Sequence, residues 1–168
     1  MVARSPAKKS RETLVDQLAA RLKNPAVLEE PFVLQDRIPQ TRSRHVVVIW
    51  DAWRDRDRAT RSAIIMDAFD QARLLEGDTI RVALGLTQQE ALHMGYLPYK
   101  IVSMHRSTDP VTPNELRKAL KSIGGVHVRT GASHELRLPS QEHAQEAYRQ
   151  LAALIPGPDW AIVQEASG

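Results

Sequence analysis

The stretch that decides the fold is residues 45–69, which reads HVVVIWDAWRDRDRATRSAIIMDAF. Residues 46–50 are apolar at every position, which predicts a strand buried on both faces in the middle of a sheet. A run of alternating arginine and aspartate follows, and either Asp55 or Asp57 can cap a helix behind it. That helix is predicted by apolar residues at helical spacing, namely Ile64, Ile65, Ala68, Phe69, Ala72 and Leu75.

The neighbouring segments extend this pattern in both directions. A helix is predicted to begin at Ser10, with leucines at steps of four, and residues 32–38 are predicted to form a strand. Alternating apolar residues from Ile80 to Leu84 predict a further strand, so the order from residue 10 to residue 85 is αββαβ. A capping box at Thr87 then starts a short linking helix.

The second half of the chain gives a different order. Residues 99–104 are predicted as a strand, and a capping box at Thr112 starts a helix that Gly124 and Gly125 end. Residues 126–138 predict a hairpin, Ser140 caps a last helix, and the residues around Trp160 predict a final strand. The order βαββαβ is that of the ferredoxin-like split βαβ fold. It indicates little about function, because this fold carries many unrelated activities.

The first half resembles the BolA family, whose core is a KH-like αββαβ unit. The segments HVVVIWDAWRDRDRATRSAIIMDAF and TIRVALGLTQQEA occupy the places of the family's second strand, loop and helix, and of its third strand with the following turn. The resemblance covers residues 10–91. The family's metal-associated histidine would fall where this chain has Ile80-Arg81-Val82, and its Arg-His pair where this chain has Thr60-Arg61-Ser62. The resemblance therefore implies the architecture and does not support a glutaredoxin-linked iron–sulfur role.

The predicted fold class is thus α+β, with helices packed on one face of each sheet. Residues 1–9 are expected to be a disordered basic tail, residues 10–97 a KH/BolA-like αββαβ subdomain with a short linking helix, and residues 98–168 a ferredoxin-like βαββαβ subdomain.

Composition excludes several classes of function. The 168 residues contain no cysteine, which removes disulfides, cysteine nucleophiles, thiolate zinc sites and cysteine-ligated clusters, and fits a cytoplasmic protein. No apolar run reaches the length of a membrane span, and no apolar segment follows the basic N-terminus as in a secretory signal. With 23 basic and 20 acidic residues, the net charge of +3 is smaller than nucleic-acid-binding proteins usually show.

The charged turn holds the first candidate site residues. Asp51 and Trp53 follow the end of the central strand, where ligand sites often lie, and a tryptophan ring can stack on a base or a cation. The alternative interpretation is that Asp51 caps backbone N–H groups of the turn and Trp53 covers the start of the helix. Anion or nucleic-acid binding is a further candidate role, for which the basic residues are Arg54, Arg56, Arg58, Arg61, Lys8 and Lys9.

The histidines and the loop after residue 104 hold the remaining candidates. His127 and His134 fall on paired strands of the hairpin, which predicts a cross-strand surface pair rather than a zinc site. The loop MHRSTDP brings His105 and Asp109 together, residue types that acid–base catalysis uses and that ordinary turns also contain. We predict no catalytic residue, no metal ligand and no cofactor, since the chain has no P-loop, G-x-S-x-G or G-x-G-x-x-G motif.

These observations favour a small, non-catalytic, cytoplasmic binding or regulatory protein. Its expected partner is another protein or a second copy of the chain, because an open sheet face and edge strands need covering. The first alternative is a nucleic-acid-binding protein that uses the arginine cluster and the basic N-terminal arm. The second alternative is a small hydrolase that uses the loop of His105 and Asp109.

Overall fold

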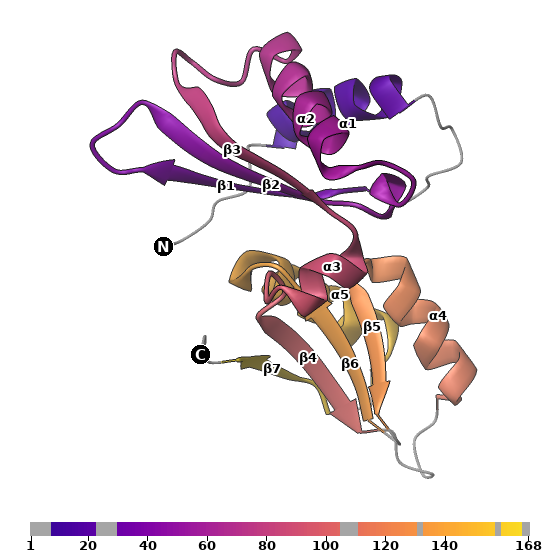
Figure 1. The fold of residues 1–168 in the computed structure, drawn as a ribbon. Coiled ribbons are helices and arrows are strands. Elements are labelled where there is room, and N and C mark those ends of the chain that lie inside the picture. The colour runs from indigo at the N-terminus through magenta and orange to yellow at the C-terminus, as the bar shows by residue number, and fades with distance from the viewer. Residues whose placement is uncertain (1–7, 23–29, 105–110, 131–132, 157–158, 166–168) are drawn as a thin grey trace. The chain divides into compact units, whose positions relative to one another are not determined.

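The structure is a computed structural model of all 168 residues, and it describes the chain apart from residues 1–7, 23–29, 105–110, 131–132, 157–158 and 166–168 (Figure 1). Its helices and strands form an α+β fold, as predicted. The chain divides into two compact units, Met1–Glu90 and Ala91–Gly168, which we call unit 1 and unit 2. Within the described ranges, no helix combines the length and the hydropathy that crossing a membrane requires.

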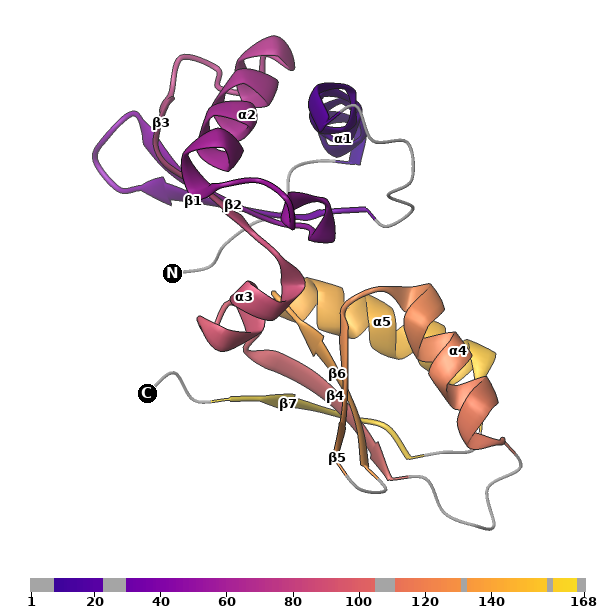
Figure 2. The ribbon, with the colours of Figure 1, turned by 45° about the vertical axis from the view of Figure 1, so that its right-hand side comes forward.

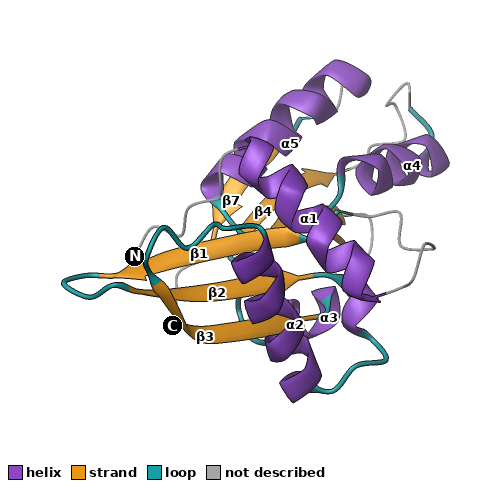
Figure 3. Cartoon of the chain, turned by 90° about the horizontal axis from the view of Figure 1, so that it is seen from above, coloured by secondary structure: helices purple, strands orange, loops and turns teal. Residues whose placement is uncertain are grey.

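Unit 1 contains a three-stranded sheet with two helices on one face (Figure 3). The central strand β2 (Ser43–Ile49) pairs antiparallel with β1 (Phe32–Ile38) and parallel with β3 (Thr79–Leu86). The parallel pair is connected by α2 (Arg58–Gln71), so these three elements form a βαβ unit. The predicted central position of the apolar strand is confirmed.

The first helix, α1 (Lys8–Leu22), completes the helical layer of unit 1. It begins two residues before the predicted cap Ser10, so Lys8 and Lys9 lie in its first turn. The predicted leucines at steps of four all face inward, with Leu14 and Leu18 at 0% exposure and Leu22 at 3%.

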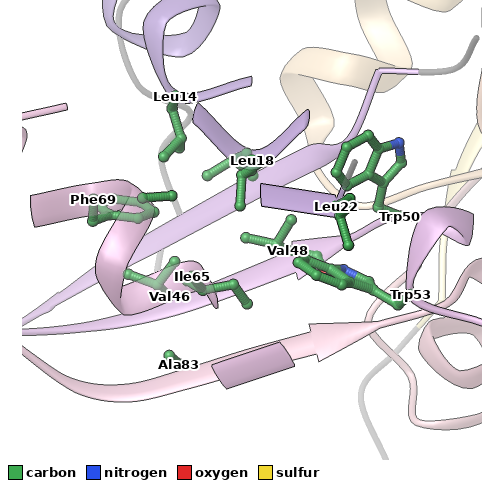
Figure 4. Close-up of a cluster of buried hydrophobic side chains, with 12 residues drawn as sticks. Leu14, Leu18, Leu22, Val46, Val48, Trp50, Trp53, Ile65, Phe69 and Ala83 are labelled. Atoms are coloured by element: carbon green, nitrogen blue, oxygen red, sulfur yellow. The ribbon is translucent and has the colours of Figure 1, made fainter. Parts of the chain in front are cut away.

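The core of unit 1 lies between this helical layer and the sheet (Figure 4). It contains Ile65 and Phe69 from the predicted stripe of α2, both fully buried, whereas Ile64 of the same stripe is only partly buried. The remaining members of the cluster are Leu14, Leu18, Leu22, Val33, Val46, Val48, Trp50, Trp53, Ala68 and Ala83.

Unit 2 contains a four-stranded sheet in the order β5-β6-β4-β7, in which every neighbouring pair is antiparallel. Its elements after the short helix α3 (Gln88–His93) all match predicted segments. The strands are β4 (Tyr99–Met104), β5 (Val126–Thr130), β6 (Ser133–Leu138) and β7 (Ala161–Gln164), and the helices are α4 (Pro113–Ile123) and α5 (Gln141–Leu154). Figure 2 shows α4 and α5 together on one side of this sheet.

The predicted helix boundaries of unit 2 have clear physical causes. Thr112 and Glu115 form the predicted capping box at the start of α4, since each side chain accepts a hydrogen bond from the other residue's backbone N–H. Ser140 caps α5 by accepting from the N–H of His143. After α4, Gly125 has φ of +92°, and a Cβ there would lie 2.8 Å from the carbonyl oxygen of Arg137, so only glycine fits without a shift.

Candidate functional site

The turn after β2 packs its two tryptophans into the core of unit 1. Trp50 and Trp53 meet edge to face, with ring centroids 5.8 Å apart and an interplanar angle of 89° (Figure 4). The indole N–H of Trp53 donates to the carbonyl oxygen of Val48 at 3.0 Å, and the side chain is fully buried. Trp53 therefore presents no ring face on which a ligand could stack. The predicted role was to cover the start of the helix, but the Trp53 side chain lies inside the core of unit 1.

Asp51 connects this turn to the start of α3. Its carboxylate accepts a hydrogen bond from the backbone N–H of Gln88 at 3.0 Å and lies 3.8 Å from the guanidinium of Arg54. The interpretation of Asp51 as a cap is therefore correct in kind, but the N–H that it caps lies 37 residues further along the chain rather than in its own turn.

Arg61 differs from the other arginines of the charged run because its side chain is buried. It is 5% exposed, and its guanidinium lies 2.5 Å from the carboxylate of Glu90. The same guanidinium donates to the carbonyl oxygens of Arg56 at 2.8 Å and Gly85 at 3.1 Å. Arg61 is thus held by three partners within unit 1, and it is not exposed as the predicted anion cluster requires.

Glu90 and Gly85 both allow the Arg61 side chain to be buried. Burial acts to raise the pKa of Glu90, but hydrogen bonds from the Thr87 backbone and Arg61 outweigh it, so the pKa lies below its ordinary value. Gly85 leaves the space that the side chain needs, since a Cβ there would lie 2.8 Å from Cβ of Arg61 and 3.3 Å from the Trp53 ring. Arg61 therefore connects α2 to β3 and to the start of α3, and we assign it a structural role.

Arg54, Arg56 and Arg58 remain exposed around the start of α2. The helix itself is capped by Asp57, which accepts from the backbone N–H of Thr60 at 2.9 Å and from its hydroxyl at 2.7 Å. Both hydrogen bonds lower the pKa of Asp57, and the bond from the Thr60 backbone has the larger effect. Of the two predicted caps, the structure therefore selects Asp57. Anion binding by the three exposed arginines stays a prediction.

An ion-pair cluster that sequence reasoning missed joins the β1–β2 hairpin to Asp78, the residue directly before β3. Asp78, 7% exposed, lies 2.8 Å from Arg44 and 3.4 Å from Arg37. The hydrogen bond from Arg44, with the charge of Arg37, holds the pKa of Asp78 below its ordinary value although burial opposes this. The available signal was the group of basic residues in RIPQTRSRH, residues 37–45.

In unit 2, the helix-covered face of the sheet contains a polar group at one end. Ser103 of β4 pairs in register with His134 of β6, and the two side chains are 1% and 4% exposed. Nε2 of His127 lies 3.0 Å from Nδ1 of His134, and the rings are parallel with centroids 5.3 Å apart. The predicted neighbourhood of the two histidines is confirmed, but they are not a surface pair, because His134 is buried.

The opposite face of the unit 2 sheet, which we call its outer face, holds a network of four charges. Arg137 lies 2.6 Å from Glu165 and 3.1 Å from Glu135, while Lys100 lies 3.2 Å from Glu165 and 3.9 Å from Glu135. Hydrogen bonds from Arg137 and Lys100 lower the pKa of Glu165 to about 2. The hydrogen bond to Glu165 likewise raises the pKa of Arg137. The network joins two basic and two acidic side chains, so its formal charges balance.

The remaining candidates lie outside the described residues or among side chains that are not described. His105 and Asp109 belong to residues 105–110, and the side chains of Lys8 and Lys9 are not described. Among the described residues, no three His, Cys, Asp or Glu side chains gather in a way that could hold a metal ion.

Comparisons with protein-family models, curated proteins and solved structures found no match to this chain. The functional assignment therefore rests on the geometry of its own residues.

Proposed function

We propose that the chain is a non-catalytic binding protein that acts by self-association through the free edge of β7. The observation that carries the proposal is the exposure of this strand. β7 is the last strand in the order β5-β6-β4-β7, and all four of its residues are exposed. Ile162 is 38% exposed and Val163 is 40% exposed. An exposed apolar strand with one unpaired edge is a template for pairing with another strand.

A second copy of the chain is the partner that fits this edge best. The strand Ala161–Gln164 contains no charge and no proline, the two devices that usually protect an edge from pairing. Antiparallel pairing of β7 with β7 of a second copy about a twofold axis would cover both free edges at once. The adjacent network of Lys100, Glu135, Arg137 and Glu165 has no net charge, which favours a protein surface over a phosphate backbone.

The finer architecture is part of the proposal. The order αββαβ in unit 1, with β2 and β3 parallel across α2, supports a KH/BolA-like arrangement. In unit 2, the order β7-β4-β6-β5 with antiparallel neighbours, and both helices on one face, supports a ferredoxin-like arrangement. A cytoplasmic location is consistent with a chain that has no cysteine.

Sedimentation velocity over a range of protein concentrations tests this function. We expect the wild type to form a dimer, and we expect Val163→Lys and Ile162→Lys to remain monomers because a charge enters the pairing edge. Met66→Lys is the matched control, since Met66 on α2 is 43% exposed and lies outside unit 2. A wild type that stays monomeric at every concentration, or a dimer that both edge variants retain, contradicts the proposal.

Nucleic-acid binding is the second candidate function, favoured by the exposure of Arg54, Arg56 and Arg58. The test is the affinity for a short single-stranded RNA and for a duplex DNA across salt concentrations. Because Arg61 is buried, the informative variant changes the three exposed arginines to Gln and keeps Arg61. If these residues contact phosphate, the variant binds more weakly and with a smaller salt dependence. Equal affinity and equal salt dependence exclude the three arginines as the contact.

A further inference from the structure

Two polar groups in unit 2 are buried without a hydrogen-bond partner among the described residues. They are the hydroxyl of Ser103 and the indole N–H of Trp160. Ser103 is 1% exposed, so its hydroxyl is also removed from bulk water. Leaving such a group unsatisfied is costly, and buried polar groups of folded proteins nearly always have a partner. Two such groups in one unit indicate a ligand position.

The two groups occupy the same level of the sheet. The pairing of β4 with β7 runs up to Val102 and Ala161, so Ser103 and Trp160 come next on the two chains. On its other side, Ser103 pairs in register with His134, which in turn contacts His127. The row from Trp160 across Ser103 to His134 and its register partner Arg129 therefore crosses the sheet on one level, while His127, which pairs with Leu136, lies diagonally to this row and contacts the ring of His134. Trp160 is only partly buried and Arg129 is exposed, so the row reaches the surface at both ends.

The charges around this row are predominantly positive. Burial lowers the pKa of His127 first, and the positive charges of Lys121, Arg117 and Arg129 lower it further. These three basic residues come from α4 and β5, on the side of the sheet where His127 lies. Two acidic residues adjoin the row in sequence: Asp159, which is exposed, directly precedes Trp160, and Glu135, which directly follows His134, is paired with Arg137 and Lys100 on the outer face. An excess of positive charge beside unpaired donors suits an anion and disfavours a metal cation.

We propose that the row formed by Trp160, Ser103, His134 and Arg129 binds a small oxyanion, with a phosphate group as the best match. The Ser103 hydroxyl and the Trp160 indole N–H donate hydrogen bonds to its oxygens, because an indole nitrogen can only donate and the hydroxyl is free to do so. Arg129, which is exposed on β5, supplies the charge of the site together with Arg117 and Lys121. Although Trp160 directly precedes β7, this site uses side-chain donors and not the backbone edge of β7, so it does not depend on the proposed function.

Indole N–H resonances of the 15N-labelled full chain provide a direct readout. The chain has three tryptophans, and the Trp53 indole N–H is already bound to Val48, so it serves as an internal control. We expect millimolar inorganic phosphate to shift the Trp160 signal, assigned with Trp160→Phe, and to leave that of Trp53 in place. Ser103→Ala should weaken binding about tenfold, since a hydrogen bond to a charged group is lost. Arg129→Gln should weaken it too, whereas Arg58→Gln, the same change on unit 1, should not.

Three further arms make the test decisive. Sodium chloride at matched ionic strength must leave the Trp160 signal in place, because a shift there would mean general charge screening and would overturn the proposal. A nucleoside monophosphate compared with inorganic phosphate distinguishes a phosphate carried by a larger molecule from the free ion, and either result supports an oxyanion site. The proposal is overturned if phosphate causes no shift of the Trp160 signal in the wild type. It is also overturned if Ser103→Ala and Arg129→Gln both show the same phosphate-dependent shift as the wild type. The Ser103→Ala variant is expected to fold, since it removes only an unpartnered hydroxyl.

Discussion

Units 1 and 2 differ in the hydrogen bonding of some of their buried polar groups. In unit 1, the buried guanidinium of Arg61 has Glu90, Arg56 and Gly85 as partners, and the buried carboxylate of Asp78 has Arg44 and Arg37. In unit 2, Ser103 and the Trp160 indole have no partner among the described residues. The difference indicates that Arg61 of the charged turn has a structural role in unit 1, whereas the two unpartnered groups of unit 2 are the ones on which the proposed oxyanion site depends.

The largest expected effect tests the core of unit 1. Trp53→Ala removes a fully buried ring and its hydrogen bond to Val48, so we expect the free energy of unfolding to fall by about 3–5 kcal/mol. Met66→Ala, on the exposed side of α2, should change it by less than about 0.5 kcal/mol. Chemical denaturation measures both. If the two variants lost similar amounts of unfolding free energy, Trp53 would not belong to the core of unit 1.

Next in size is the loss of the Arg61 contact. Arg61→Gln leaves Glu90 without its charged partner and frees the carbonyl oxygens of Arg56 and Gly85, so we expect a loss of about 2 kcal/mol. Arg58→Gln, an exposed residue of the same helix, is the control and should cost less than about 0.5 kcal/mol. If both variants unfold at the same denaturant concentration, Arg61 has no structural role and the contrast between the units fails.

A smaller steric effect is expected at Gly85. Gly85→Ala places a Cβ 2.8 Å from Cβ of Arg61, and the crowding should cost about 1–2 kcal/mol. The matched substitution is Gly95→Ala, where no atom lies within 4 Å but φ is +75°, so any loss there comes from the backbone alone. The pair Gly85→Ala and Arg61→Ala resolves the cause, because removal of the Arg61 side chain should make the added methyl less costly.

The smallest effect concerns the acid sensitivity of unit 2. The folded pKa of Glu165 is about 2, below its ordinary value of 4.5. Because the folded pKa is the lower one, the stabilisation is complete above the unfolded pKa and is lost as the pH falls from about 4.5 towards about 2. Carboxyl chemical shifts measured against pH should show this midpoint, and Arg137→Gln should raise it. A midpoint near 4.5 in the wild type would exclude the ion pair in solution.

The sequence was sufficient for the elements of the fold but not for the long-range polar contacts. Residues 46–50 are apolar on both faces, which placed β2 in the centre of its sheet, and the capping box at Thr112 placed the start of α4. Such signals are local in the chain. By contrast, Arg61 meets Glu90 across 29 positions and Asp51 meets Gln88 across 37, so no local pattern could separate the buried Arg61 from its exposed neighbours.

The same limit applies to the candidate site. The spacing of His127 and His134 on a hairpin predicted that they are neighbours, because hairpin register is set locally. Their burial beside Ser103 depends on β4 lying next to β6, a pairing between residues about 30 positions apart that no local pattern specifies. The exposure of β7 likewise follows from its place at the edge of the sheet.

Hydrogen exchange of the β7 amides at high and low protein concentration tests the proposed self-association most directly. Pairing of β7 with a second copy predicts that exchange of the Ala161–Gln164 amides slows as the concentration rises, while the amides of α5 keep the same rates. In Val163→Lys, the β7 amides should exchange at the dilute rate at every concentration. Exchange of the wild-type β7 amides that does not change with concentration would contradict the account.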